Sequence, residues 1–287
     1  MKILAIIVTY NSEKWIEKNI SSIMQDGFEG DILVIDNGSK DQTPDIIKNN
    51  FPDVRIIESG ENLGFARANN VGFEIAKQGG YDFVFLINHD GWLLPDFWSH
   101  VIPVLTDRRF AKYGLLSPVH LDATENGLDH GFRKYAGEAL GNHFNTVFDV
   151  DLMNAAFLFI SRKCLEDLKG FDPIFFFYGE DIDLCERAKR KGYKIGIIRG
   201  AKVVHDRHQR KMTKERLQLH LFANAIIQIK SGRNNFLENF GKALVSNSLF
   251  AFRKNPVLGY IPFLYFKNIL KLMINIRRIK HSYYQYK

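Results

Sequence analysis

Three acidic residues stand close together in the second half of the chain, directly after a run of aromatic residues. Glu180, Asp181 and Asp183 follow the aromatic segment 175–178. The helix dipole favours acids at a helix N-terminus, so helix capping is one explanation of this cluster. Three acids in four positions exceed what capping needs, and burial against the aromatic rings would raise a carboxylate pKa. The cluster therefore also suits a general base.

A second set of polar residues follows short apolar runs of the kind that form buried strands. Asp36 follows one such run, and Asn88 and Asp90 follow another. A carboxylate at a strand end is well placed to hold a divalent cation, because Mg²⁺ needs only one or two protein carboxylates and completes its shell with phosphate oxygens and water. The alternative is that these residues only form turns before the glycines that follow them.

A histidine follows a third apolar run. His205 comes after Val203 and Val204 and lies close in sequence to Arg207 and Arg210. Its imidazole could ligate a metal ion or contact a diphosphate. A purely structural role for this histidine is the alternative.

The first third of the chain alternates between apolar runs and segments of helical periodicity. We expect helices at 12–24, after residue 41 and at 65–77, and strands at the ranges 3–8, 31–35, 54–58 and 82–87. This alternation predicts a parallel sheet with helices on both faces. Ligands of such sheets bind beyond the carboxyl ends of the strands. Thr9 and Asn11, Asp36, and Asn88 with Asp90 all lie at those ends.

The pattern is weaker after residue 110. We expect residues 112–149 to be rich in loops, with one strand near 115–119. Further on, we predict a strand at 157–160, a helix at 180–191, two strands at 194–198 and 202–205, and a helix at 213–230.

Length and motifs narrow the function classes. The chain has 287 residues, which fits one large domain or a domain with an appendage. Its two cysteines cannot form a disulfide framework or a zinc site, which favours a reducing compartment. The turn after the first strand contains no glycine, and neither GxGxxG nor a P-loop motif occurs. We therefore do not expect dehydrogenase or P-loop chemistry.

The positive charge is concentrated at the C-terminal end. The net charge is +7, and residues 230–287 hold eleven of the 39 Lys and Arg residues but only one of the 32 acids. Large apolar residues are interleaved with these bases, as in a helix that lies in a membrane interface. A helical appendage packed on the body is the alternative. No uncharged run approaches the ~18 residues that span a bilayer, and no nucleic-acid-binding motif is present.

Taken together, these motifs resemble one family. The sequences VTYN (8–11), IDNGS (35–39), NLGFA (62–66), Asn88-x-Asp90 and GFD (170–172), followed by the acids at 180–183, are similar to those of the family 2 inverting glycosyltransferases. The resemblance is strongest to the rhamnosyltransferase-like bacterial branch and covers residues 1 to about 210.

This resemblance implies the GT-A fold, a Rossmann-like, mostly parallel α/β sheet that binds a nucleotide-sugar, with helices on both faces. It further implies a donor-binding half at 1–110 and an acceptor-binding and catalytic half at 111–230, to which the composition of the tail adds a basic, aromatic helical appendage at 231–287. By similarity, the catalytic base is Asp181, with Glu180 beside it, and the metal ligands are Asp90 and His205. The donor nucleotide is then bound by Thr9, Asn11, Asp36, Asn62, Gly64, Phe65, Arg67 and Asn88.

The sequence departs from the family pattern at three positions near the acceptor. His89 stands where the family often has proline, Asn154 replaces a small residue, and Arg210 lies where glycine or serine is common. We expect these three residues to contribute to the acceptor site or to a cationic lid over the diphosphate.

The implied reaction is a single displacement assisted by Mg²⁺ or Mn²⁺. A UDP- or dTDP-sugar would be the donor and a glycan or a polyprenyl-linked molecule the acceptor, in cell-surface polysaccharide synthesis. The enzyme would be cytoplasmic and peripheral to the inner face of the cytoplasmic membrane, which it would contact through residues 231–287. A sugar nucleotidyltransferase and a non-catalytic carbohydrate- or membrane-binding scaffold are the alternatives.

Overall fold

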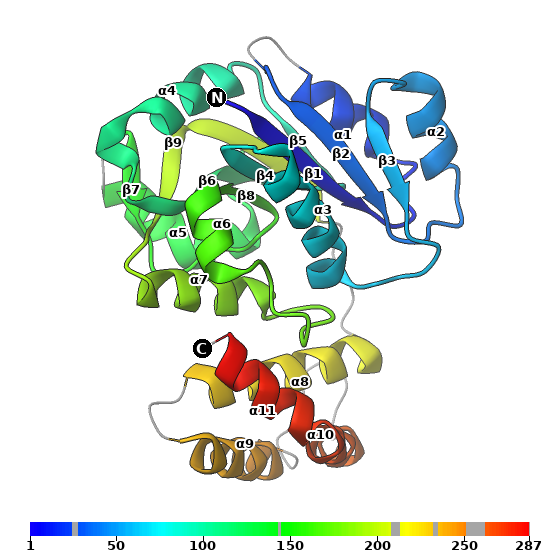
Figure 1. Cartoon of the computed structure of the whole chain (residues 1–287), viewed down its shortest axis with the longest axis vertical. Helices are drawn as coiled ribbons and strands as arrows, with labels where there is room; N and C mark the ends of the chain where they lie inside the picture. The colour runs from blue at the N-terminus through cyan, green and yellow to red at the C-terminus, as the bar shows by residue number, and fades with distance from the viewer. Residues whose placement is uncertain (25–27, 143–144, 208–212, 232–234, 251–261, 287) are drawn as a thin grey trace.

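A nine-stranded sheet forms the centre of the α/β part of the molecule. The computed structural model describes residues 1–24, 28–142, 145–207, 213–231, 235–250 and 262–286. The strand order is β3-β2-β1-β4-β8-β6-β9-β5, and β7 pairs with β9 (Figure 1). The strands are β1 (Ile3–Thr9), β2 (Asp31–Asp36), β3 (Arg55–Glu58), β4 (Phe83–Asn88), β5 (Gly91–Leu93), β6 (Tyr113–Leu121), β7 (Val147–Asp149), β8 (Phe157–Ser161) and β9 (Lys194–His205).

The sheet is parallel only in part. β3, β2, β1 and β4 run parallel to one another, as the alternating pattern of the first third predicts. β8 then runs antiparallel to both β4 and β6, and β9 is parallel to β6 but antiparallel to β5 and β7. The α/β fold class is therefore confirmed: β3, β2, β1, β4, β6 and β9 share one direction, and the short strands β5, β7 and β8 run against them.

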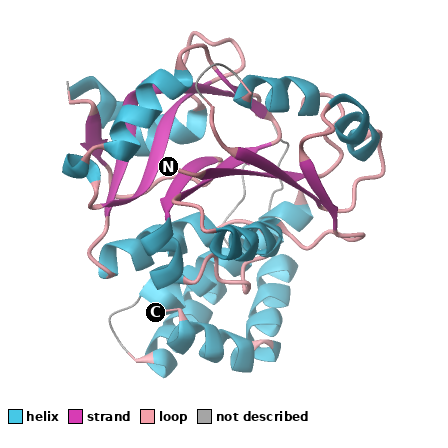
Figure 2. Cartoon of the chain, turned by 45° about the horizontal axis from the view of Figure 1, so that its top comes forward, coloured by secondary structure: helices cyan, strands magenta, loops and turns pink. Residues whose placement is uncertain are grey.

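Helices cover both faces of this sheet (Figure 2). Alternate side chains of β1 point to opposite faces: Leu4 and Ile6 join one core cluster, and Ala5 and Ile7 join the other. The first cluster is closed by α3 (Phe65–Gly79), α5 (His130–Asn142), α6 (Arg162–Leu168) and α7 (Glu180–Arg190). The second is closed by α1 (Ile16–Ile23), α2 (Thr43–Asn50) and α4 (Phe97–Thr106).

Two sequence expectations for the second half are wrong. The stretch 112–149 is not mainly loop, because it contains α5 and β7 as well as β6. Phe132 and Ala136 are the buried core residues of α5, with Tyr135, Ala139 and Leu140 packed against the same cluster, and three glycines interrupt the sequence of the helix. The two strands expected at 194–198 and 202–205 are one strand, β9, whose apolar runs are separated by Arg199 and Gly200.

Four helices follow the sheet and pack together below it in Figure 1. They are α8 (Lys214–Ser231), α9 (Phe236–Phe250), α10 (Pro262–Ile274) and α11 (Ile276–Gln285). Their core contains Ile226, Ile229, Phe236, Leu272 and Ile279, and Phe175 from the loop before α7 joins it. The C-terminal helices thus pack against the α/β body through the aromatic segment singled out in the sequence.

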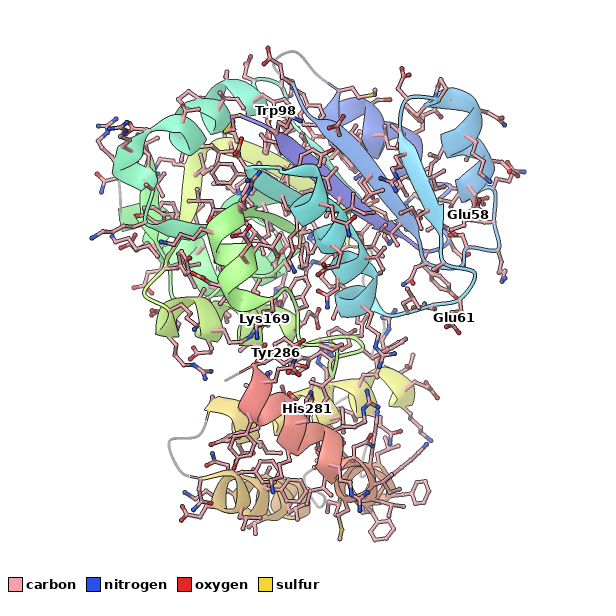
Figure 3. The ribbon with its side chains drawn as sticks, viewed as in Figure 1. Glu58, Glu61, Trp98, Lys169, His281 and Tyr286 are labelled. Atoms are coloured by element: carbon pink, nitrogen blue, oxygen red, sulfur yellow. The ribbon has the colours of Figure 1, made fainter. Side chains whose placement is uncertain are left out.

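A buried network of ion pairs connects the C-terminal helices to the α/β body. Lys230 Nζ of α8 lies 2.5 Å from Asp172 Oδ2 and 2.6 Å from Asp183 Oδ1 of α7. Asp183 also accepts a 2.7 Å hydrogen bond from Arg187 Nε, and Asp172 accepts one from Ser282 of α11. The network lies at the junction marked by Tyr286 in Figure 3, whose ring is 5.5 Å from both Lys230 Nζ and the Arg187 guanidinium. Within the described part of the chain, no helix has the length and apolar character to cross a membrane.

Candidate active site

The carboxyl ends of β1 and β2 bring Thr9 and Asp36 into contact. Both side chains are buried, and Thr9 Oγ1 donates a 2.9 Å hydrogen bond to Asp36 Oδ1. Asp36 also accepts hydrogen bonds from the backbone N–H and the hydroxyl of Ser39, at 3.0 and 2.5 Å. The carboxylate therefore builds the turn that follows β2, which is the turn-forming role that the sequence leaves open for it.

Asn11 lies beside this turn in a left-handed backbone conformation, with φ of 51°. Its Oδ1 accepts a 2.8 Å hydrogen bond from the Lys40 backbone, and its own N–H donates to Ser39 Oγ at 2.9 Å. An open cavity of about 400 Å³ lies next to it, lined by Asn11, Glu13, Lys14, Lys40 and Asp41. The ends of β1 and β2 therefore lie beside a cavity that is lined by polar and charged residues.

The segment before α3 is fixed by asparagine side chains. Asn62 Oδ1 accepts hydrogen bonds from Asn37 Nδ2 at 3.0 Å and from the Gly64 N–H at 2.9 Å. Gly64 has φ of +79°, and a Cβ at this position would lie 2.4 Å from the carbonyl oxygen of Phe176. Only glycine allows this approach, through which Phe65 N donates to the same carbonyl at 3.1 Å.

Phe65 and Arg67 lie in the first turn of α3, and their side chains contact different parts of the molecule. The Phe65 ring packs against the Phe171 ring, with centroids 5.7 Å apart. The Arg67 guanidinium reaches the loop before α7, where Nε is 3.4 Å from the Pro173 carbonyl oxygen. Arg67 lines a cavity shared with the C-terminal helices, whereas Asn62 and Gly64 lie next to the ends of the strands.

Asp90 and His205 meet at the end of β4. Asp90 Oδ1 lies 3.3 Å from His205 Nε2, and both residues are buried. β5 and β9 run antiparallel and pair Gly91 with His205, which fixes the distance between the two side chains. Asn88 Nδ2 is 3.4 Å from the same imidazole nitrogen. The structure thus brings together three residues that are up to 117 positions apart in the sequence.

Arg207 connects this group to the acidic cluster. Its Nε is 3.1 Å from His205 Nδ1 and 3.3 Å from Asp129 Oδ2. Burial raises the pKa of Asp181 in the first turn of α7, and the charge of the Arg207 guanidinium opposes this rise, so the two groups lie within electrostatic range of each other. Arg210 lies outside the described residues.

The two acids at the start of α7 differ in their environments. Burial, together with the neighbouring Asp181, raises the pKa of Glu180 to about 8, and its Oε2 is buried without a hydrogen-bond partner among the described residues. Burial also raises the pKa of Asp181, but a 2.8 Å hydrogen bond from the Ile182 N–H and the charge of Arg207 oppose this rise. At neutral pH Glu180 is therefore the protonated member of the pair, and Asp181 is the stronger candidate for the ionised one.

His89 and Asn154 lie close to Asn88 at the end of β4. The His89 ring meets the edge of Trp15, with centroids 5.8 Å apart. Asn154 Oδ1 accepts a 3.2 Å hydrogen bond from Ala156, whose carbonyl in turn accepts from the Asn88 N–H at 2.7 Å. Both residues are partly exposed. His89 lies between Asn88 and the start of α1, and Asn154 lies between Asn88 and the start of β8.

Two sets of side chains offer a divalent cation its ligands. Asp90 and His205 Nε2 supply one carboxylate and one imidazole, a donor pair that suits Mn²⁺ and, with phosphate oxygens added, Mg²⁺. His120, Asp129 and His205 also place their ligand atoms within 4.8 Å of one another. In that second group the Arg207 guanidinium already lies against Asp129 and His205 Nδ1. Because Arg207 Nε–H donates to His205 Nδ1, a neutral imidazole carries its proton on Nε2, so a cation on the Asp90 side would require Nε2 to lose this proton and Arg207 to leave Nδ1. With that change the residues present fit such a cation.

The sequence analysis did not select three residues of this site: Arg207, Asp129 and His120. His120 lies near the end of the apolar strand β6, so the rule that found Asp36 and Asp90 could also have found it. Asp129 precedes α5, in the stretch where the sequence shows no clear element, and nothing near it in the sequence points to a site.

A family model connects this geometry with known proteins. Residues 4–152, just over half of the chain, match the model described as Glycosyl transferase family 2. The chain belongs to this family. It is a glycosyltransferase and uses a sugar-nucleotide donor.

Named relatives cover about 70% of this glycosyltransferase. It is 26% identical over 233 residues to N-acetylglucosaminyl-diphospho-decaprenol L-rhamnosyltransferase of Mycobacterium tuberculosis. This match covers 70% of the chain and 74% of that relative. It is 26% identical over 216 residues to the dTDP-rhamnosyl transferase RfbF of Shigella flexneri. This match covers 71% of the chain and 68% of RfbF. The recognition of the family from its motifs is confirmed.

Solved structures share the GT-A fold. Residues 1–349 of S. aureus TarS in complex with UDP-GlcNAc align with a TM-score of 0.60 at 16% identity, over 98% of this glycosyltransferase and 84% of TarS 1–349. The mannosyltransferase PcManGT of Pyrobaculum calidifontis, in complex with GDP-Man and Mn²⁺, aligns with a TM-score of 0.60 at 18% identity, over 97% and 82% of the two chains.

Proposed function

We propose that this glycosyltransferase moves a sugar, with inversion at the anomeric carbon, from a UDP- or dTDP-sugar to a hydroxyl group of a glycan or polyprenyl-linked acceptor in cell-surface polysaccharide synthesis. The relative from M. tuberculosis is named for a diphospho-decaprenol acceptor and that from S. flexneri for a dTDP-linked rhamnose. These names support a rhamnose-type donor and a lipid-linked acceptor.

One observation carries the proposal: Arg207 contacts His205, which lies against Asp90, and the charge of Arg207 also reaches Asp181 in the first turn of α7. A transferase of this kind needs a place for the leaving diphosphate and a base for the acceptor within the same cleft. Asp90 and His205 lie where they would hold a divalent cation. When bound, such a cation neutralises the charge that develops on the leaving diphosphate.

The chain's own residues divide the proton chemistry between them. Asp181 accepts the proton of the acceptor hydroxyl while the oxygen attacks the anomeric carbon and the bond from that carbon to the diphosphate oxygen breaks. Glu180 keeps its proton at neutral pH and is able to donate a hydrogen bond to a sugar or acceptor oxygen. The charge of Arg207 favours the ionised form of Asp181 and so opposes the effect of burial. General-base help of this kind contributes about 10²–10⁴ in rate.

The C-terminal helices support a place at the inner face of the cytoplasmic membrane. One face of α10 is apolar and exposed, with Phe263 and Ile274 each 72% accessible and Phe266, Leu270 and Met273 between them. Lys267 of this helix is exposed as well, and so is Arg277, three residues after Ile274. Apolar side chains flanked by cations favour the interface of an anionic bilayer.

A donor-binding experiment tests the proposal. Thermal unfolding of the full chain is followed with UDP, dTDP and their sugars, each with and without Mn²⁺. We expect stabilisation by one of the nucleotides with Mn²⁺, and loss of this metal-dependent part in Asp90→Ala. Asp181→Asn should keep that stabilisation and lose about 10²–10⁴ in transfer rate. Stabilisation that is independent of metal, or normal turnover by Asp181→Asn, would contradict the assignment.

A further inference from the structure

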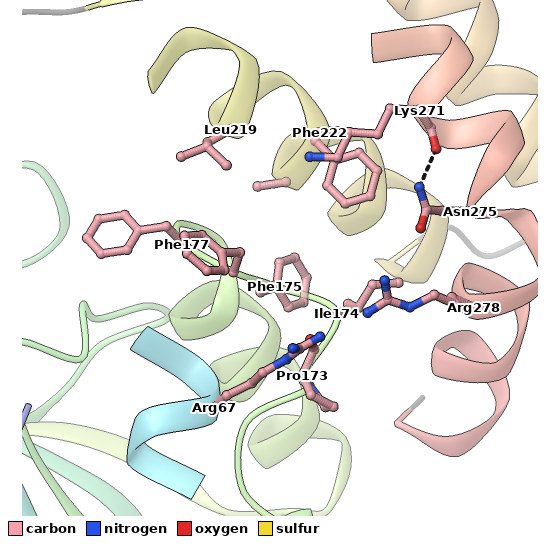
Figure 4. A pocket seen from close by; sticks show the side chains of 12 residues that line it. Arg67, Pro173, Ile174, Phe175, Phe177, Leu219, Phe222, Lys271, Asn275 and Arg278 are labelled. Carbon is pink, nitrogen blue, oxygen red and sulfur yellow. Dashed lines mark hydrogen bonds between the residues drawn. The ribbon is translucent and has the colours of Figure 1, made fainter. Parts of the chain in front are cut away.

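A cavity of about 350 Å³ lies at the junction between the α/β body and the C-terminal helices (Figure 4). This volume falls within the range of about 300–1,000 Å³ that is typical of small-molecule sites. Eight of its twelve lining residues are apolar, among them Phe175, Phe176, Phe177 and Phe222, and three are basic: Arg67, Lys271 and Arg278. The lining contains no acid. The cavity therefore combines an aromatic wall with excess positive charge.

None of the three cations has an acidic partner among the described residues. Arg67 makes only a long hydrogen bond to the Pro173 carbonyl oxygen, at 3.4 Å. Lys271 Nζ lies 4.3 Å from the centre of the Phe222 ring. Figure 4 shows the Arg67 and Arg278 guanidinium groups pointing toward each other from opposite sides of the cavity. Cations brought together without a counter-charge repel one another, and an anion between them would remove that cost.

The environment of Lys271 supports this interpretation. Burial lowers the pKa of its ammonium group, and the charges of Lys267 and Arg278 lower it further. A bound anion would act in the opposite direction and stabilise the charged ammonium. The Phe222 ring beside it provides some compensation, because an aromatic face attracts a cation.

The cavity adjoins the candidate active site. Its aromatic wall belongs to the loop that leads into Glu180 at the start of α7. The same loop also contacts the turn before α3. There the Phe176 carbonyl oxygen accepts a hydrogen bond from Phe65 N–H and leaves no room for a side chain at position 64. A ligand in this cavity is thus separated from the donor-binding strand ends by one segment of chain.

We propose that this cavity binds the phosphate or diphosphate of a polyisoprenoid-linked acceptor, with the anion among Arg67, Lys271 and Arg278 and the first isoprenoid units against the Phe175–Phe177 and Phe222 rings. This inference rests on the proposed function, because it places the lipid end of the acceptor whose hydroxyl faces Asp181.

The apolar lining decides between a lipid-linked anion and a free one. A soluble phosphate or nucleotide would contact the cations and leave the phenylalanine rings unused. An isoprenoid chain would cover these rings and could continue along the exposed face of α10, where Leu270 and Ile274 flank the cavity residues Lys271 and Asn275. The same face is the one that we propose lies against the bilayer.

Binding of short analogues to the full chain tests the inference. Isothermal titration uses farnesyl diphosphate below its micelle concentration, with inorganic pyrophosphate and farnesol as the two separate halves. We expect farnesyl diphosphate to bind at least tenfold more tightly than either half. Lys271→Met and Arg278→Met should each weaken it about tenfold, the loss expected for a hydrogen bond to a charged group. Phe176→Ser, at a residue that is 45% exposed, should weaken farnesyl diphosphate but not pyrophosphate.

Lys280→Met is the matched control, because Lys280 is an exposed cation on α11 that does not line the cavity. It should leave the affinity unchanged. Equal affinity for pyrophosphate and farnesyl diphosphate would show a free-anion site, and equal affinity for farnesol would show a purely apolar one; either result overturns the inference. So does normal binding by Lys271→Met and Arg278→Met. Metal-dependent stabilisation by UDP or dTDP, measured on the same variants, reports separately on the proposed donor site.

Discussion

Two groups of cations lie at the same junction and differ in how their charge is balanced. Lys230 and Arg187 are buried and paired with Asp172 and Asp183 at 2.5–2.7 Å. Lys271, with Arg67 and Arg278 in the cavity beside it, has no acidic partner within the described part of the chain. The first group accounts for how the helices are held on the body, whereas the second is better explained by a ligand.

The difference shows how charge at an internal junction can be interpreted. A cation removed from water costs several kcal/mol unless an anion and further hydrogen bonds compensate it. At Lys230 the protein itself supplies this compensation, with Asp172 also bonded to Ser282. At Lys271 the compensation must come from solvent or from a bound anion. Paired charge therefore indicates structure, and unpaired charge beside apolar rings indicates binding.

The largest effect on stability is expected from breaking the paired group. Lys230→Met keeps most of the unbranched side chain and leaves Asp172 and Asp183 buried without their shared cation. We expect the free energy of unfolding, measured in urea, to fall by about 3–5 kcal/mol. Lys271→Met removes a cation that has no acidic partner among the described residues and should change it by less than about 0.5 kcal/mol or raise it. Equal losses in the two variants would contradict the distinction between the two groups.

A smaller effect concerns two carboxylates on α7. Asp183 is paired with two cations, whereas Glu180 is buried beside Asp181, and its pKa is raised to about 8. Between the unfolded value of 4.5 and about 8, native Glu180 keeps a proton that the unfolded chain loses, so stability falls as pH rises through this window. Glu180→Gln removes this dependence and should become more stable than the wild type toward pH 8. The difference between the two proteins should grow by up to about 1.4 kcal/mol for each pH unit within the window.

The measurement is the unfolding temperature of both proteins across this window, from mildly acidic to mildly alkaline pH. Glu186→Gln is the matched control, because Glu186 lies on the same helix but is partly exposed and pairs with Lys189 at 2.9 Å. Its difference from the wild type should be nearly constant over this range. A constant difference for Glu180→Gln as well would show that Glu180 is ionised in the native protein at neutral pH.

The sequence predicts the parallel half of the sheet well because each strand there is a short apolar run. β1, β2 and β4 are buried on both faces, and the alternating helices between them leave few possible topologies. The second half is harder to predict. Its strands run in both directions, β9 is interrupted by Arg199 and Gly200, and α5 is interrupted by three glycines.

The candidate site is predictable where a polar residue ends a strand and unpredictable where contacts are made over long distances. Asp36, Asn88, Asp90 and His205 all follow apolar runs, and the structure places the last three together. Arg207 lies two residues after His205, but its position against Asp129 and its effect on Asp181 arise only in the folded chain, so the sequence does not predict them. The junction cavity likewise depends on helices that meet only in the folded chain, and Arg67, assigned by resemblance to the donor, lines that cavity.

The smallest effect on stability is expected on the exposed face of α10, which has neither charge pairing nor burial to lose. Phe266 is 64% accessible, so Phe266→Ser should change the free energy of unfolding by less than about 0.5 kcal/mol. The same change removes an apolar side chain from the proposed membrane-facing surface and should weaken sedimentation with vesicles that contain anionic lipid. Tyr284→Ser, at a residue that is 67% accessible on α11, is the matched control and should sediment as the wild type does. If both variants sediment normally, the α10 face does not contact the bilayer, and an isoprenoid chain that leaves the junction cavity would have to follow another path.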